Sequence, residues 1–166
     1  MQARDVLIEA FGRLPDLVRA AVEGLDPEQL RYAPAGGANT IGWLVWHLTR
    51  VQDSHIAELI GAEQVYLAGD WAPRFGLEPD PSDTGYGHTA AQVARVAPAG
   101  WQVLVDYYDA VHERTVGFLG GLTAADLDRV VDEAWDPPVT MGVRLVSIHD
   151  DDTEHVGQAA YLRGLL

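Results

Sequence analysis

The sequence predicts an all-α protein, a four-helix bundle, and two observations lead to this prediction. Apolar residues recur three or four positions apart in four separate segments of the 166-residue chain, which is the spacing of helices with one buried face. No segment shows the strict alternation of apolar and polar residues that marks a half-buried strand. The length suits one domain, so we expect residues 1–166 to form a single bundle without internal repeats.

The first helix is expected over residues 2–23, where apolar side chains follow the helical period. Pro15 interrupts this pattern and should kink or restart the helix, because proline lacks the amide hydrogen of the helix ladder. Asp26 then precedes Pro27 and can cap one further turn.

The second helix is expected over "IGWLVWHLTRVQDSHIAELIG", the most hydrophobic stretch, with Asn39 or Thr40 as its cap and Gly61 at its end. A long irregular segment follows over residues 62–97. Its aromatic residues indicate that it is ordered, and "HTAAQVARV" within it favours a short helix. Long loops in compact domains are usually functional or disordered, so this ordered loop becomes a candidate part of a site.

The third helix fits residues 98–122, where Gly120 and Gly121 provide the stop. A connection follows, with one turn expected at 123–128 behind the cap residue Thr123. The fourth helix should begin near Thr140 or Met141 and run to the C-terminus. The four helices together predict a bundle with a long ordered loop between the second and third.

Composition excludes several classes of function. The net charge of −14 disfavours nucleic-acid binding through a basic face. The chain contains no cysteine, which rules out disulfides, thiolate zinc sites and a cysteine nucleophile. All 11 basic residues are arginine, so a Schiff-base lysine is excluded as well. No apolar run is long enough to span a membrane and no signal peptide is apparent, so we expect a cytoplasmic protein without a membrane partner.

The stretch "SIHDDDTEHVGQ" places acidic residues and histidines inside the apolar stripe of the fourth helix. Asp151 and His155 are four positions apart, so their side chains converge on one face of the helix. A buried charge is costly unless it is paired or bound to a metal, which favours a metal site. Asp152, three positions before His155, is the alternative ligand. Asp150 and Glu154 are interpreted as solvated charge.

His47 is the natural third ligand, because it lies in the middle of the other strongly apolar segment. Together with Asp151 and His155 it would make a set of two histidines and one carboxylate, which leaves positions open for water or substrate. The alternative for His47 alone is an ordinary core histidine, and the alternative for the D-x-x-x-H pair alone is a solvated helix face. His55, two turns beyond His47, could support the ligands or replace one of them.

The segments "IGWLVWHLTRVQDSHIAELI" and "GVRLVSIHDDDTEHVGQAAYLRGLL" resemble the second and fourth helices of the DinB-like superfamily. That family has a histidine before leucine on helix two, as His47 is here, and an H/E-x-x-x-H pair on helix four that ends before x-G-Q/H. Asp151 and His155 occupy the positions of this pair. The resemblance, which extends to the metal-binding domain of mycothiol-dependent maleylpyruvate isomerases, implies an up-down-down-up bundle and one divalent metal, often zinc or nickel.

The resemblance also implies an activity, since characterised members use the metal to activate a low-molecular-weight thiol. We therefore expect a thiol-dependent S-transferase or isomerase that acts on a small electrophile, and the arginine-only composition is compatible with an actinobacterial host and hence with mycothiol. Catalytic residues are not assigned. Candidate substrate-binding residues are Arg163, Trp43, Tyr86 and His88. A non-catalytic, stress-related metal-binding bundle and a metal-dependent hydrolase remain the alternatives, and family habit favours a homodimer.

Overall fold

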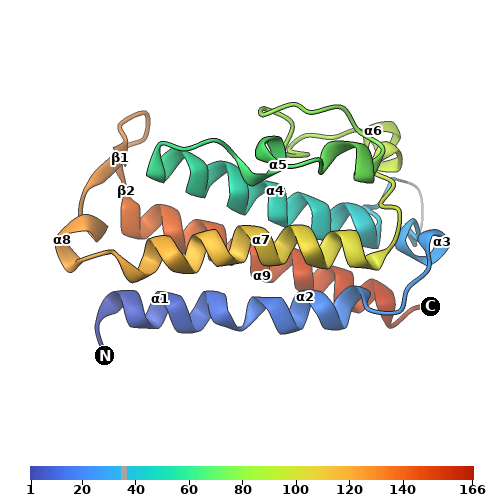
Figure 1. The fold of residues 1–166 in the computed structure, drawn as a ribbon, viewed down its shortest axis with the longest axis horizontal. Coiled ribbons are helices and arrows are strands. Elements are labelled where there is room, and N and C mark those ends of the chain that lie inside the picture. Colours follow the sequence, from blue (N-terminus) through green and yellow to red (C-terminus); the bar gives the residue numbers. More distant parts are fainter. Residues whose placement is uncertain (35–36) are drawn as a thin grey trace.

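The computed structural model describes residues 1–34 and 37–166, and it is mostly helical, as the sequence predicts, with 63% helix and 3% strand. Long helices lie alongside one another in Figure 1: α1 (Ala3–Gly12) and α2 (Leu14–Val22) end to end, then α4 (Ile41–Ile60), α7 (Trp101–Gly120) and α9 (Met141–Arg163). None of the helices in the described ranges combines the length and apolar character that crossing a bilayer requires.

The start of each early helix follows from local chemistry. Pro15 occupies the first turn of α2, so the first predicted helix is interrupted there and restarts. The Asp26 carboxylate accepts hydrogen bonds from the amides of Glu28 and Gln29 at 2.9 and 2.8 Å, and the short α3 (Pro27–Leu30) begins there. Residues 35–36, within the turn region between the first two predicted helices, lie outside the described residues.

The two helices that matter most for the site begin at the predicted residues; α4 also ends as predicted, while α9 ends at Arg163, just before the C-terminus. The Thr40 hydroxyl accepts a hydrogen bond from the Trp43 amide and caps α4, and Gly61, at a φ of 67°, ends it. Thr140 caps α9 in the same way through the amide of Val143. The contacts of His47 with His155 and of His55 with Arg144 show that α4 and α9 run antiparallel.

The segment after α4 is ordered and lies over that helix in Figure 1. It contains α5 (Val65–Ala68), a 3₁₀ helix η1 (Ala72–Phe75) and the expected short helix α6 (Ala90–Arg95). The connection before α9 contains α8 (Ala124–Leu127) at the predicted turn. It also contains an antiparallel hairpin, β1 (Val130–Asp132) and β2 (Val139–Thr140), that the sequence did not predict. Strands of two or three residues are too short to show an alternating pattern.

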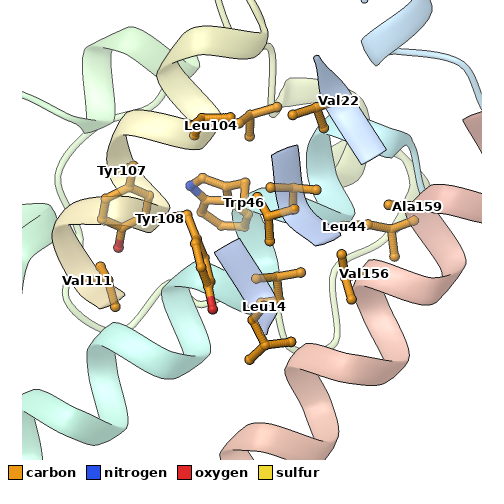
Figure 2. Close-up of a cluster of buried hydrophobic side chains, with 14 of the residues drawn as sticks. Leu14, Val22, Leu44, Trp46, Leu104, Tyr107, Tyr108, Val111, Val156 and Ala159 are labelled. Carbon is orange, nitrogen blue, oxygen red and sulfur yellow. The ribbon is translucent and has the colours of Figure 1, made fainter. Parts of the chain in front are cut away.

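The core fills the space between the long helices. Figure 2 shows Trp46 of α4 and Tyr108 of α7 in this cluster, together with Leu14 of α2 and Val156 of α9. All four are at most 3% exposed. Each such side chain contributes about 1.5–3 kcal/mol through burial, so this cluster fixes the relative positions of α4 and α9.

Candidate metal centre between α4 and α9

His47, Asp151 and His155 come together between α4 and α9. Each offers one ligand atom, and these atoms all lie within 4.8 Å of one another. The Asp151 Oδ1 atom is 3.6 Å from His155 Nε2, as expected for residues one helical turn apart. The His47 and His155 rings meet edge to face, with centroids 4.8 Å apart. The fold therefore assembles the three residues that the sequence singled out, from two separate helices.

The His47 ring is held in one orientation and one tautomer. Its Nδ1 lies 2.5 Å from the carbonyl oxygen of Thr84, and because a carbonyl can only accept, Nδ1 carries the proton. The indole of Trp43 stacks on the ring at a centroid distance of 4.5 Å. Nε2 is left with a free lone pair, which is the state a metal ligand needs.

The environment also keeps His47 neutral. The pKa of the His47 imidazole is lowered from 6.5 to about 4, mainly by burial, with the Thr84 hydrogen bond opposing the shift and the nearby His155 and His88 rings adding to it. At neutral pH the ring does not need to lose a proton before it can bind a cation.

The two α9 residues complete a donor set that suits a divalent cation. His155 Nδ1 is 2.9 Å from the Gln158 side-chain oxygen, which fixes Nδ1 as the donor and leaves Nε2 free on the side of Asp151. The Asp151 Oδ2 atom is buried and has no hydrogen-bond partner within the described part of the chain. Burial raises the pKa of the Asp151 carboxyl, against the opposing effect of His155. A buried, unsatisfied carboxylate oxygen beside two imidazole nitrogens fits zinc, nickel and related ions.

The long loop is anchored to α4 through a buried arginine. The Arg50 guanidinium, fully buried, donates to the carbonyl oxygens of Asp80, Pro81 and Asp83 at 3.2, 3.4 and 3.1 Å. The next residue along the chain is Thr84, whose carbonyl contacts His47. Arg50 therefore fixes the piece of loop that orients the His47 ring.

Gly85 lets this loop approach the ring closely. Its φ is +92°, and a Cβ atom there would lie 2.9 Å from His47 Nδ1 and 2.9 Å from the Trp46 ring. No other residue combines this backbone conformation with this lack of volume. The segment "DTGYGHT" (residues 83–89), which we call the strap, thus packs against the candidate ligand His47 through Thr84 and Gly85.

His88 and Trp43 support the ligand set from the side. His88 Nδ1 accepts a hydrogen bond from the Trp43 indole at 3.1 Å, and its Nε2 is 2.9 Å from the Asp83 carboxylate. This chain of contacts fixes the indole that stacks on His47. Of these two candidates for substrate binding, Trp43 therefore contacts His47 directly, and His88 acts on the site through Trp43.

The other candidate residues are not part of the ligand set. Asp152 is fully buried in the core, with neither carboxylate oxygen hydrogen-bonded to a described residue, and its burial holds the pKa of that carboxyl well above the usual range. Tyr86 is 93% exposed. Arg163 donates to the Glu23 carbonyl at 2.9 Å, at the far end of α9. His55 lies closer to the ligand set, beside Asp151 in the wall of a pocket between α4 and α9. Asp150 and Glu154 are exposed, as interpreted.

Sequence reasoning missed several residues that shape the site. Arg50 is an arginine in the most hydrophobic of the predicted helices, and this position was the available signal for a buried anchor. The hairpin folds back on α9 and so brings together three further residues beside Asp151: Arg144, Asp132 and Trp135. No local sequence pattern predicted this contact.

Comparison with known proteins now gives the family context. The sequence pattern of the DinB superfamily matches residues 10–159. A crystal structure of a conserved protein from Enterococcus faecalis is similar to this chain, with a TM-score of 0.90 and 32% identity over 98% of this chain and 96% of that one. A search of curated proteins found no match.

Proposed function

Because the chain belongs to the DinB superfamily, we propose that it is a divalent-metal-dependent enzyme that activates a low-molecular-weight thiol for S-transfer or isomerisation. The proposed ligands are His47, Asp151 and His155, and the proposed ion is zinc or nickel. The observation that carries the proposal is that ligand atoms from two helices lie within 4.8 Å of one another.

The donor set supports one bound ion with free positions. Three protein ligands leave room for a small molecule, and an ion in this place would lower the pKa of a thiol and stabilise its thiolate. His47 and His155 can both present Nε2 to an ion, because their Nδ1 atoms are engaged by Thr84 and Gln158. Asp151 supplies the negative charge that offsets part of the charge of the ion.

A thiol cosubstrate is supported by what the chain lacks. The protein has no cysteine, so any sulfur nucleophile must come from a second molecule. Mycothiol is the proposed thiol, and the electrophile is a small organic molecule. The same family membership supports the proposed up-down-down-up course of the bundle and a homodimer in the cytoplasm.

A thermal-shift screen tests this proposal with mycothiol, bacillithiol, glutathione and coenzyme A, each with and without zinc. We expect one thiol to raise the melting temperature only when zinc is present, because a ligand stabilises the state that it binds. The His47→Ala variant should lose this response. Thiol-independent cleavage of esters or amides by the zinc-loaded protein would favour a hydrolase instead. Zinc binding with no response to any thiol or substrate would favour a non-catalytic bundle.

A further inference from the structure

A pocket of about 560 Å³ adjoins the candidate ligands on the hairpin side. It lies between α4, α9 and the β1–β2 hairpin, and Asp151 belongs both to its wall and to the ligand set. A molecule bound here would lie next to whatever the three ligands hold.

The charged side chains of this pocket disfavour the binding of an anion. Arg144 is its one cationic side chain among the described residues, and it is already paired with Asp132 at 2.9 Å and with Glu58 at 3.4 Å. Asp151 adds a third carboxylate. No unpaired positive charge is therefore available for a carboxylate or phosphate, and the net charge of −14 acts in the same direction.

His55 supplies a hydrogen-bond donor with a defined tautomer. The Arg144 Nη1 atom lies 3.0 Å from His55 Nδ1, while the Glu58 carboxylate is more distant from the same atom at 3.7 Å. A guanidinium only donates, so Nδ1 accepts and the ring proton resides on Nε2. Burial, assisted by Arg144, lowers the pKa of the ring. Nε2 has no hydrogen-bond partner among the described residues.

The remaining wall is mostly apolar, with Ser147 as its polar member. Val51, Val143 and Ile148 line the pocket, and Trp135 stands at the hairpin with 66% of its surface exposed. An exposed indole at the edge of a pocket offers a flat face for stacking.

We propose that this pocket binds an uncharged carbonyl compound with a flat apolar body, whose oxygen accepts a hydrogen bond from His55 Nε2 and whose body packs against Trp135. The inference rests on the proposed function only in assigning that compound as the electrophile. The recognition itself is a property of the pocket, with or without a metal.

Benzamide and benzoate provide a matched test, since they have nearly the same shape and differ in charge. Their binding is measured by NMR through the signals of the two small molecules, which can be followed in every variant, on metal-free and on zinc-treated protein. We expect benzamide to bind at least about tenfold more tightly than benzoate to the metal-free protein, since benzoate meets only paired or negative groups. Equal or tighter binding of benzoate there, or no benzamide binding, would overturn the proposal.

Two variants locate the contacts. His55→Phe keeps an aromatic ring but removes the donor, and should weaken benzamide binding about tenfold. Trp135→Ala changes an exposed side chain, so it should fold, and it should also weaken binding. Tyr161→Ala, an exposed aromatic on α9 outside this pocket, should leave binding unchanged. Unchanged affinity in Trp135→Ala would contradict the assignment, even if His55→Phe fails to fold.

The outcome separates this inference from the proposed function. Failure to bind zinc, with benzamide binding intact, would defeat the metal-dependent proposal and leave the pocket standing. Zinc binding through His47, with no discrimination between the two probes, would defeat the pocket and leave the metal-dependent proposal standing.

Discussion

His47 owes its properties to its surroundings more than to its own chemistry. The Thr84 carbonyl fixes its tautomer, Trp43 fixes its plane, and burial keeps it neutral. The sequence could identify His47 as a candidate because it lies in an apolar helix. It could not identify Thr84, because that contact is made by a loop 37 residues away.

The neutral state of His47 predicts a specific dependence of stability on pH. Its pKa is about 4 in the folded protein and 6.5 in the unfolded chain, so between these values the unfolded state binds more protons. The free energy of unfolding of the metal-free protein should therefore fall as the pH is lowered from 6.5 towards 4, by up to about 3 kcal/mol from this group. Urea unfolding of the native protein and of His47→Gln at both ends of this range measures the contribution. Identical pH dependences in the two proteins would contradict it.

Asp152 should have the opposite effect. Its pKa is raised well above 3.8 by burial, so the folded state at pH 7 carries the cost of a buried acid. Asp152→Asn should raise the free energy of unfolding at pH 7 by about 2 kcal/mol, and the gain should shrink as the pH approaches 3.8. Chemical denaturation at pH 7 and pH 4.5 measures this.

The exposed Asp150→Asn serves as the control for Asp152→Asn and should change stability little. Zinc affinity that is lost in Asp152→Asn would instead make Asp152 a ligand, contrary to the set proposed here.

At the scale of single helices, the sequence predicted well wherever the signal is local. Thr40, Gly61 and Thr140 mark helix ends through caps that involve only near neighbours. The face of α9 was harder, because Asp151 and Asp152 are adjacent and the apolar stripe is interrupted at both. The structure places Asp152 and Val156 in the stripe and leaves Asp151 and His155 at its edge, facing α4. Tertiary packing, and not the local sequence pattern, therefore decides which of the two aspartates is buried in the core.

The strap over His47 gives a prediction with a matched control. Gly85 and Gly87 both have positive φ, at 92° and 75°, but a Cβ atom at Gly85 would collide with His47 and Trp46, while one at Gly87 meets open space. Both alanine variants carry the backbone strain, about 1 kcal/mol. Gly85→Ala should lose a further 1–3 kcal/mol, by order of magnitude, from overpacking and should weaken zinc binding.

Thermal unfolding and calorimetric zinc titration of the two variants check this. Equal losses of stability and of zinc affinity in Gly85→Ala and Gly87→Ala would show that the loop does not pack closely against His47.

At the scale of the whole molecule, the helical class could be anticipated from hydrophobic spacing, and the pairing of the second with the fourth predicted helix from the candidate ligands His47, Asp151 and His155. The hairpin could not, because its pairing joins residues on either side of a turn with no alternating pattern. The pocket beside Asp151 depends on that hairpin, so it too was beyond sequence reasoning. The features that the structure adds to the sequence analysis depend mostly on contacts between distant segments, such as the contact of Arg144 with His55.

The central claim is that His47, Asp151 and His155 hold one divalent ion, and elemental analysis tests it most directly. Protein purified without chelators or a nickel column is measured by plasma mass spectrometry beside His47→Ala, His155→Ala and the control His149→Ala, whose ring packs against Phe11 away from the site. The account predicts about one zinc or nickel per chain in the native protein and in His149→Ala, and a loss of metal in the other two. Native protein without bound metal, or equal metal content in all four, would contradict it.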